Sequence, residues 1–377
     1  MNSKTSKPVV IAGAGPTGLM CAIALARQNI PVIVFEAEPA LTHDLRAGSY
    51  HPPTLEMMAP YGITDRMHDT GLQVQEWQIR DKRGEYIAQF DLGLLADVTP
   101  YPYRLHLEQH RLTPIQLDIL RAIPGTEVHF NHRVADYTQD GDGVRVTVET
   151  DGETRVIEAS WLIGADGSRS VVRKGTGVEF EGFTWPEFFV VASTPYDLGQ
   201  HGFTMNAYVS DPIEWAAVFK VPDDGPPGLW RAAFYGDPQK SDAELLDPAN
   251  IERAMQLLVQ RDQPYEIRYK SIYRVHQRVA QTFIHGRALL AGDAAHLNNP
   301  LGGMGMNGGL HDGLNLCEKL VAVHRGEASV EILDRYERQR RPIAIEYINA
   351  NTNRNKKMME ERDPAVRRIA QDEMRRA

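Results

Sequence analysis

Two glycine-rich stretches at opposite ends of the chain contain the residues best suited to chemistry. The first, VVIAGAGPTG at residues 9–18, places Gly13, Gly15 and Gly18 at the G-x-G-x-x-G spacing. In a strand-turn-helix unit, this spacing brings the backbone amides of a helix N-terminus towards a dinucleotide pyrophosphate. The second, GDAAHLNNPLGGMGMN at residues 292–307, joins an acid at a strand end to a glycine loop that opens another helix. Together they predict one extended dinucleotide held from both ends of the chain, which favours FAD over a transient NAD.

The first stretch has the context that makes a glycine fingerprint specific. Its glycines permit, in chain order, a tight turn, a close backbone approach to the pyrophosphate, and close packing of helix on strand. Pro16 and Thr17 open the helix, whose first amides face the phosphates. Glu36 lies 18 residues beyond Gly18, which is about the spacing of a carboxylate that binds ribose hydroxyls. NAD and FAD share this fingerprint, so the second stretch has to distinguish them.

In the second stretch, Asp293 follows the apolar strand 288–291, so its carboxylate is expected at the carboxyl edge of a sheet, where ligands bind. Residues 300–307 then expose successive amides at the start of a helix. A positive helix end of this kind suits the anionic N1–C2=O side of a reduced flavin. The residues expected to supply these contacts are Gly303, Met304, Gly305, Met306 and Asn307.

The elements that must position these residues form a β-α-β unit at the start of the chain. Strands are predicted at residues 8–12 and 32–35 around an alanine-rich helix at 17–28, for which Asn29 is a stop signal. A second helical pattern covers 109–122. Residues 144–150 and 156–157 form a hairpin around Asp151-Gly152, and residues 161–163 return to the parallel sheet.

Residues 176–280 differ in character, because aromatic and β-branched runs alternate there with Pro, Gly and Asp turns. This pattern predicts a mostly antiparallel sheet inserted in the nucleotide-binding fold. The expected strands lie at 188–192, 203–209, 215–221, 229–235 and 265–275. The chain re-enters the first domain at 287–293, and helices follow at 307–325 and from 330 onward.

Composition narrows the function classes. The net charge of −9, with no dominant block of Lys or Arg, argues against nucleic-acid binding. Cys21 and Cys317 are the only cysteines and form no CxxC pair, which excludes the flavoprotein disulfide reductases. No signal peptide and no run of 18 apolar residues is found. We therefore expect a cytoplasmic protein that works without a membrane, a nucleic acid or a metal site.

Three motifs in this order resemble the single-component, FAD-dependent aromatic hydroxylases typified by p-hydroxybenzoate hydroxylase. They are the fingerprint at 13–18 with Glu36, the segment GADGSRSVVR at 164–173, and GDAAH at 292–296 with the glycine loop after it. The resemblance covers nearly the whole chain. It implies an α/β fold with a Rossmann-like, GR2-type FAD-binding domain, an inserted, mostly antiparallel substrate-binding sheet, and C-terminal helices.

On this resemblance we divide the chain into six segments. The FAD-binding domain takes residues 1–75, 109–175 and 281–330, a substrate-domain segment takes 76–108, the substrate-binding β-sheet domain takes 176–280, and the C-terminal helices take 331–377. Larger relatives carry a thioredoxin-like C-terminal domain, for which this sequence leaves no room.

The resemblance also assigns roles to residues. Asp293 is expected to bond the ribityl chain of FAD, Pro300 to lie beside the C4a/N5 edge of the flavin, and the amides of residues 303–307 to reach N1 and O2. Arg46 resembles an arginine that touches the cofactor. Gln109 stands where many relatives have Arg and is expected to reach the phosphates or the ribityl chain. Asp166 belongs to a motif that serves both FAD and the reducing nicotinamide.

The activity implied is hydroxylation of a phenolic or heteroaromatic small molecule. NADPH or NADH reduces FAD, O2 adds to give the flavin C4a-hydroperoxide, and the electron-rich ring takes the distal oxygen. A polar side chain that hydrogen-bonds a substrate hydroxyl would raise the nucleophilicity of the ring. The candidates are His51, Tyr208 and Tyr235, with Tyr50, His201 and Arg231 as further choices; His296 is expected to lie near the cofactor in a structural role. Family members are often homodimers, and the sequence leaves the oligomeric state open.

Other readings keep the cofactor but change the function. One is an FAD-dependent reductase or dehydrogenase of the same fold without oxygen transfer. A second is a flavin-dependent halogenase, but the Trp-x-Trp-x-Ile-Pro signature is missing, and the nearest string, FTWPEF at 183–188, does not match. A third is a flavoprotein sensor without turnover, although such a protein would have no reason to keep the intact glycine motifs and Asp293.

The strand-end position of Asp293 generates a first prediction. Asp293→Ala should purify with little or no FAD, because the variant lacks the carboxylate expected to bond the ribityl chain. The FAD content per polypeptide, read from the visible absorption spectrum, is the measurement. A normal flavin content in this variant would count against the assigned site.

Overall fold

The computed structural model describes residues 7–43, 48–82, 84–300, 303–348, 361 and 363–376. A six-stranded sheet forms the first of its two large sheets, with the strand order β18-β19-β12-β1-β2-β8. The strands are β1 (Val9–Ala12), β2 (Val32–Phe35), β8 (Thr126–His129), β12 (Trp161–Gly164), β18 (Ile284–His285) and β19 (Ala288–Leu290). Five run parallel, and β18 is an antiparallel edge. The predicted parallel sheet, including the return at 161–163, is confirmed.

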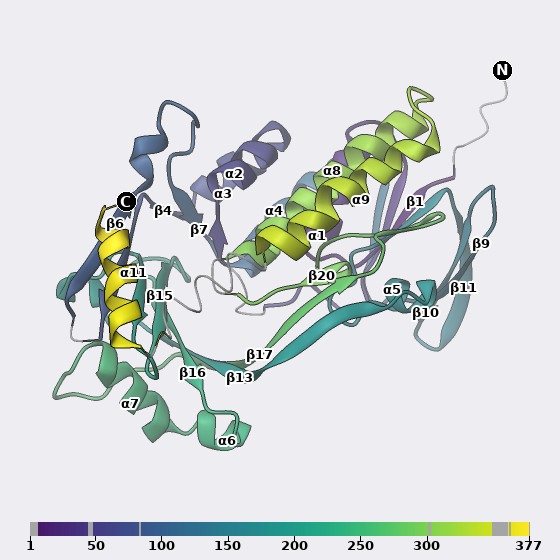
Figure 1. Cartoon of the computed structure of the whole chain (residues 1–377). Coiled ribbons are helices and arrows are strands. Elements are labelled where there is room, and N and C mark those ends of the chain that lie inside the picture. Colours follow the sequence, from purple (N-terminus) through teal and green to yellow (C-terminus); the bar gives the residue numbers. More distant parts are fainter. Residues whose placement is uncertain are drawn as a thin grey trace.

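Helices pack on this sheet and on one another, and Figure 1 shows α1, α8 and α9 gathered on one side of it. Their bounds are α1 (Pro16–Ala26), α4 (Gln109–Arg121), α8 (Met304–His324) and α9 (Leu333–Pro342). Asn29 has φ 61°, as its predicted role of stopping α1 requires. The predicted start of α8 at Asn307 is wrong. The helix begins at Met304, because Gly303 adopts φ 67° and lets the chain turn into the helix directly.

The second large sheet has eight strands in the order β20-β17-β13-β16-β15-β14-β5-β6. They are β5 (Glu76–Asp81), β6 (Tyr86–Asp91), β13 (Phe180–Thr194), β14 (Asn206–Ser210), β15 (Ala216–Val221), β16 (Leu229–Gly236), β17 (Tyr269–Ala280) and β20 (His296–Leu297). All neighbours are antiparallel except β14 and β5. The predicted mostly antiparallel sheet is therefore confirmed.

Strand β13, with 15 residues, is much longer than the alternation at 188–192 predicts, and β17, with 12 residues, ends five residues beyond the predicted strand 265–275. They form a long curved pair that reaches from near α5 (Val171–Thr176) to the rest of the sheet (Figure 1). At its far end β17 pairs with β20, which directly follows the Gly292-Asp293 turn. This connection joins the second sheet to the glycine-rich end of the chain.

Smaller elements complete the fold. There are also two three-stranded sheets. One contains β9 (Arg133–Gln139), β10 (Val144–Thr150) and β11 (Glu153–Ala159), and the other contains β3 (Ser49–Tyr50), β4 (Leu72–Val74) and β7 (Arg104–His106). The remaining α-helices are α2 (Pro52–Met58), α3 (Ile63–His68), α6 (Asp242–Leu245), α7 (Pro248–Leu258) and α11 (Pro364–Arg376). Short 3-10 helices are η1 (Ala59–Tyr61), η2 (Leu92–Leu95), η3 (Leu198–His201), η4 (Gly292–Ala294) and η5 (Val330–Ile332), and η6 (Ile343–Ile348) is a π-helix. In the part of the chain described, no helix has the length and apolarity needed to cross a bilayer.

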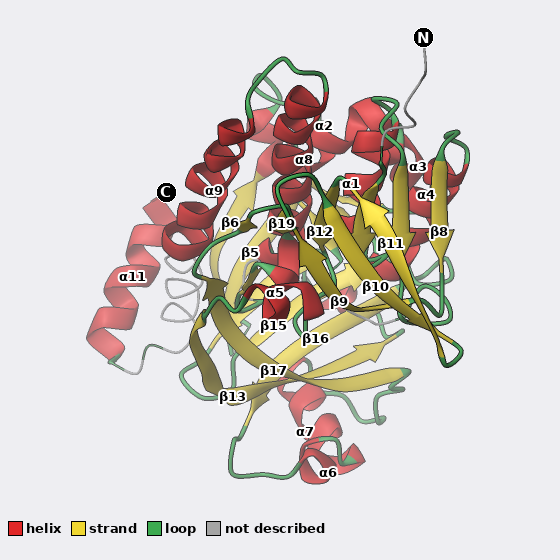
Figure 2. Cartoon of the chain, turned by 90° about the vertical axis from the view of Figure 1, so that its right-hand side faces the viewer, coloured by secondary structure: helices red, strands yellow, loops and turns green. Residues whose placement is uncertain are grey.

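The eight-stranded sheet has two different faces. One packs against α7, where Ala232 and Phe234 meet Ile251 and Met255. Figure 2 shows α6 and α7 on the side of this sheet away from α8 and α9. The opposite face is aromatic and joins Tyr208, Tyr235 and Tyr273 to buried residues such as Phe189 and Trp215. Strand alternation therefore separates a structural face from a face that looks towards the nucleotide-binding part.

Helices α1 and α8 cross at a contact made by glycines. A Cβ on Gly309 would lie 2.6 Å from Thr17 Oγ1 and 3.1 Å from Gly292 Cα, and a Cβ on Gly313 would lie 2.9 Å from Cys21 Sγ. The distances of 2.6 and 2.9 Å are too short for a real side-chain carbon, and 3.1 Å is tighter than most such contacts. Only glycine lets these backbones approach so closely, and this approach places the N-termini of both helices and the turn at Gly292 side by side.

This crossing predicts the effect of adding one methyl group. Gly309→Ala should destabilise the protein by about 1–3 kcal/mol, because the methyl overpacks the contact. Gly141→Ala is the matched control, since its Cβ would meet nothing within 4 Å, and it should change stability by less than about 0.5 kcal/mol. Thermal denaturation of the two variants is the measurement, and equal midpoints would contradict the role of the crossing.

Candidate functional site

The first glycine turn combines closed packing with one open position. A Cβ on Gly13 would lie 2.5 Å from the Ala165 carbonyl oxygen, and one on Gly18 would lie 2.0 Å from the Gly13 carbonyl oxygen. A Cβ on Gly15, in contrast, meets nothing within 4 Å. Gly15 is also the N-cap of α1 and offers no side chain to the free amides. Pro16 and Thr17 form the first turn of α1, so open space lies in front of a helix end that suits a phosphate.

Glu36 fastens this turn to the end of β2. Its carboxylate accepts hydrogen bonds from the backbone N–H of Ala14 at 2.7 Å and of Glu38 at 3.0 Å. A carboxylate has about four lone-pair positions, so these two bonds leave room for a ribose hydroxyl. The predicted ribose contact stays a prediction, and the structure adds a role in holding the glycine turn.

The second glycine stretch begins at a turn that touches the first. Gly292 has φ 61°, and a Cβ there would lie 2.8 Å from Thr17 Oγ1. Asp293 is exposed in η4, and Pro300 is exposed before the loop that leads into α8. Gly303 caps α8 without a side-chain hydrogen bond, and the half-buried residues 304–306 form the first helical turn. Two uncapped helix N-termini and an acid are thus brought together.

Asn307 joins the segment from Ser49 to Thr54 to the start of α8 through hydrogen bonds of its side chain. Its Oδ1 accepts from the His51 backbone N–H at 3.1 Å and from Thr54 Oγ1 at 2.6 Å. Its Nδ2 donates to the carbonyl oxygens of Ser49 at 2.9 Å and Gly303 at 2.6 Å. The side chain of Asn307 therefore positions His51, whose Nε2 is 3.5 Å from where a Cβ on Gly303 would lie.

Asp166 is engaged within its own motif. Its carboxylate accepts from Ser170 Oγ at 2.5 Å and from the backbone N–H groups of Val171 at 2.7 Å and Val172 at 3.1 Å, which caps α5. Burial raises the pKa of this carboxyl, although these hydrogen bonds oppose the shift. Arg173 extends the motif, because its guanidinium donates to the Ala294 carbonyl oxygen at 2.9 Å and so ties 164–173 to the turn in η4.

Gln109 and Arg46 are the other two residues predicted to contact the cofactor. Gln109 is the first residue of α4 and is half-buried. A residue that the sequence reasoning did not single out, Gln116, ties the same helix to the start of α1 by donating to the Pro16 carbonyl oxygen at 3.1 Å. Arg46 lies outside the described residues.

The candidates for contact with a substrate fall in different places. Tyr208 and Tyr235 lie on the aromatic face of the eight-stranded sheet. Arg231 is buried beside the Phe219 ring, and burial lowers its pKa while Glu108 opposes this shift. Tyr50 is fully buried in the main core, where burial raises its pKa. His201 is apart from them, in η3, where it pairs with the Tyr196 hydroxyl at 2.6 Å.

A buried charge network lies directly behind the Gly292 turn. His296 Nε2 lies 2.7 Å from Asp312 Oδ2, Arg340 Nε donates to Asp312 Oδ1 at 2.6 Å, and the Gly292 N–H lies 3.3 Å from Asp312 Oδ2. Burial opposes ionisation of Asp312, yet His296 and Arg340 together lower its pKa to about 2. The expected structural role of His296 thus has a partner that the motif did not reveal.

His106 and Glu108 were also missed by the sequence reasoning. Both are buried next to β3, and His106 Nδ1 lies 2.8 Å from the Lys220 carbonyl oxygen on β15. The alternation Arg104-Leu105-His106-Leu107 was a usable signal, since period two places Arg104 and His106 on one face.

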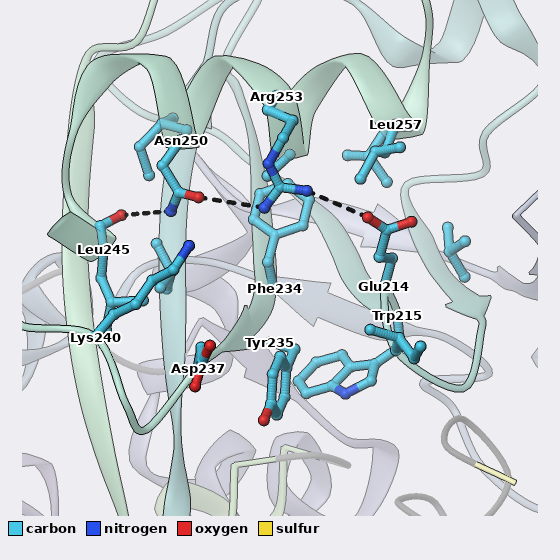
Figure 3. Close-up of a pocket in the computed structure, with 16 residues that line it drawn as sticks. Glu214, Trp215, Phe234, Tyr235, Asp237, Lys240, Leu245, Asn250, Arg253 and Leu257 are labelled. Atoms are coloured by element: carbon cyan, nitrogen blue, oxygen red, sulfur yellow. Dashed lines mark hydrogen bonds and ion pairs between the residues drawn. The ribbon is translucent and has the colours of Figure 1, made fainter. Parts of the chain in front are cut away.

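A separate cavity lies between the eight-stranded sheet and α7 (Figure 3). Val209 and Phe234 line it from the sheet, and Asn250 and Arg253 line it from α7. Arg253 bridges Asn250 and Glu214 there, each at 3.2 Å. Tyr235, one of the predicted substrate contacts, also lines this cavity, and none of the three motifs contributes to it.

Comparison with known proteins identifies the family. The model of the FAD binding domain family matches residues 6–351. The chain belongs to the FAD-dependent aromatic hydroxylases. It is 37% identical over 373 residues to para-nitrophenol 4-monooxygenase of Pseudomonas sp. (strain WBC-3), covering 98% of this chain and 91% of that protein.

A further relative and a solved structure are also monooxygenases. The chain is 34% identical to 6-hydroxy-3-succinoylpyridine 3-monooxygenase HspB of Pseudomonas putida (strain DSM 28022 / S16), covering 92% of this chain and 87% of that protein. The crystal structure of p-nitrophenol 4-monooxygenase PnpA from Pseudomonas putida DLL-E4 superimposes with a TM-score of 0.93 at 35% identity, over 98% and 93% of the two chains. These relatives are monooxygenases, which supports oxygen transfer over the reductase reading.

The residues of this aromatic hydroxylase fit FAD. The open space at Gly15 and the uncapped N-terminus of α1 suit the pyrophosphate. The N-terminus of α8 offers a second positive end, next to the enclosed Nε2 of His51, which has no partner among the described atoms. Gly13 and Gly18, which pack too closely for any side chain, hold the turn in shape.

The network at Asp312 generates a prediction about stability. Asp312→Asn should cost about 3–5 kcal/mol near neutral pH, because it leaves Arg340 without its buried counter-charge. Asp118→Asn, which removes the exposed pair with Arg66, should cost less than about 1 kcal/mol. Thermal denaturation compares the two variants.

The pH dependence of the same variant has a definite sign. The pKa of Asp312 in the folded protein lies below the ordinary value of 3.8, so its contribution is complete above that pH and is lost as the pH falls to about 2. The deficit of Asp312→Asn should therefore shrink over that window. A deficit near neutral pH no larger than that of Asp118→Asn would contradict the role of the network.

Proposed function

We propose that this aromatic hydroxylase acts on a phenol or a hydroxypyridine, with O2 as the oxygen source and NADPH or NADH as the reductant. The observation that carries the proposal is the meeting of the α8 N-terminus with the aromatic face of the eight-stranded sheet. The Asn307 side chain donates to the Ser49 carbonyl oxygen, and Ser49 is the strand partner of His106. The centroids of the His106 and Phe219 rings are 6.2 Å apart. A ring compound between these elements would lie beside a flavin bound at the α8 N-terminus.

The cofactor contacts in this proposal follow the glycine stretches. Bound FAD supplies the chemistry, which is the transfer of one oxygen atom from O2 to the ring after reduction by the nicotinamide. The residues proposed to hold FAD are Gly13, Gly15, Pro16, Thr17, Gly18, Glu36, Arg46, Gln109, Asp166, Asp293, Gly303, Met304, Gly305, Met306 and Asn307. Pro300, at the exposed entry to the α8 loop, is proposed to lie beside the reactive edge.

On the substrate side, the protein orients the ring and excludes water. Tyr208 and Tyr235 provide flat apolar surface with hydroxyl groups on the buried aromatic face. His51 is neutral at pH 7, because burial, followed by the nearby Arg104, lowers its pKa to about 3. An uncharged imidazole of this kind can exchange hydrogen bonds with a substrate or with the flavin without adding charge. Arg231 adds a buried cation to the same face.

The names of the two nearly full-length relatives support the substrate class. One is named for para-nitrophenol and the other for a hydroxypyridine, so both names carry a ring hydroxyl. We infer the same feature for the substrate of this protein. A homodimer and a cytoplasmic location stay predictions from the sequence.

Paired measurement of oxygen and nicotinamide tests the proposal. The purified protein should consume O2 together with NADPH or NADH at least about tenfold faster when a suitable phenol or hydroxypyridine is present. The panel includes 4-nitrophenol and 3-hydroxypyridine, and the hydroxylated product is identified by mass. Anaerobic saturation of a substrate double bond would instead support the reductase reading, and the absence of any aromatic-dependent turnover would contradict the proposal.

A further inference from the structure

His106 is a buried histidine whose tautomer is determined by its surroundings. The residue is fully buried at the end of β7, and its Nδ1 lies 2.8 Å from the Lys220 carbonyl oxygen. A carbonyl oxygen can only accept, so the hydrogen is on Nδ1. In the neutral ring Nε2 then carries a bare lone pair and can only accept.

The ring is neutral at physiological pH. Burial is the main cause that lowers its pKa to about 4; the Lys220 carbonyl opposes the shift and Arg104 adds to it. Nε2 is enclosed and has no hydrogen-bond partner among the described atoms. Since buried polar atoms are nearly always hydrogen-bonded, this acceptor calls for a donor from outside the described chain, which a water or a bound molecule would supply.

The neighbours of His106 show where this donor would be. Ser49 is its register partner in the β3–β7 pair, and the Ser49 hydroxyl is also enclosed without a partner. A Cβ on Gly303 would lie 3.9 Å from Ser49 Cβ, which places this pair at the start of α8. On the other side the ring meets Phe219 edge to face. His106 thus lies between the helix end proposed for the flavin and the sheet proposed for the substrate.

We propose that Nε2 of His106 accepts the hydrogen bond of the ring hydroxyl of the substrate. The inference rests on the proposed function and identifies the group that selects a hydroxyl-bearing ring. The hydrogen stays on the substrate oxygen and no bond breaks at this step. The lone pair of the histidine polarises the O–H bond and so raises the electron density at the ring carbons ortho and para to it.

Two substitutions separate the contact with Lys220 from the contact with substrate. In His106→Asn the amide N–H can still donate to the Lys220 carbonyl, but no acceptor remains at the position of Nε2. In His106→Gln the longer side chain returns an amide oxygen near that position. His276→Asn is the control, because His276 lies in β17 of the eight-stranded sheet, outside the β3–β7 pair, and pairs through Nδ1 with Thr184 at 2.9 Å.

The probes are 4-nitrophenol, used at a pH where its hydroxyl keeps its hydrogen, and 4-nitroanisole, in which a methyl group replaces that hydrogen. Their binding to the FAD-loaded protein is read from the perturbed flavin spectrum, and FAD affinity is measured separately on the apoprotein. The wild type should bind the phenol about tenfold more tightly than the ether. His106→Asn should lose about tenfold for the phenol and nothing for the ether, His106→Gln should recover part of the loss, and the control should match the wild type.

Each other outcome overturns a defined statement. Equal affinity of the wild type for the two probes overturns the inference without any variant. The inference is also overturned if His106→Asn still discriminates between the phenol and the ether. If that variant in addition binds FAD more weakly, the donor to Nε2 belongs to the cofactor. A wild type that shows no aromatic-dependent O2 uptake overturns the proposed function itself, which is a distinguishable failure.

Discussion

The rest of the site depends on the close contact between α1, α8 and the turn at Gly292. Gly309 and Gly313 let α8 cross α1 directly against the side chains of Thr17 and Cys21, with no side chain from α8 at the contact. As a consequence, the positive N-terminal ends of two helices point at one region, beside the strand end that carries Asp293. Two like ends in one place repel each other, and a dinucleotide with an anionic pyrophosphate offsets that cost.

Polar networks on two sides of α8 hold this arrangement. On one side Asn307 binds the segment from Ser49 to Thr54, and on the other Asp312 binds His296 and Arg340. Asn307 and Asp312, at the centres of the two networks, are buried, which strengthens their hydrogen bonds. The helix therefore connects the substrate side of the site to the turn that carries Asp293, and its position cannot change without breaking one network or the other.

The eight-stranded sheet is the part of the molecule that we propose binds the substrate. Its outer face is occupied by α7, while the inner face presents aromatic rings, Arg231 and the His106 contact at Phe219. Strand β17 carries this sheet to β20, directly after the Gly292 turn. Changes of side chain on the inner face can therefore alter which ring is bound, while the cofactor part stays the same.

The sequence alone was enough to predict the family, the parallel sheet, the inserted antiparallel sheet and the three motifs. These features depend on local rules, namely the period of two in strands and the positive-φ conformations that favour glycine, as at Gly13 and Gly303. Local rules also explain the errors, since the length of β13 and the bounds of β17 depend on pairing with each other and with β20.

Only the tertiary structure decided which polar residues form the site. Asn307 and His51 are 256 residues apart, and His106 meets Lys220 across 114 residues. A single histidine between two leucines has the same local pattern whether its ring is in solvent or enclosed. Its tautomer, its neutrality and its unused acceptor follow from burial and from a distant carbonyl oxygen, and these are properties that no spacing along the chain encodes.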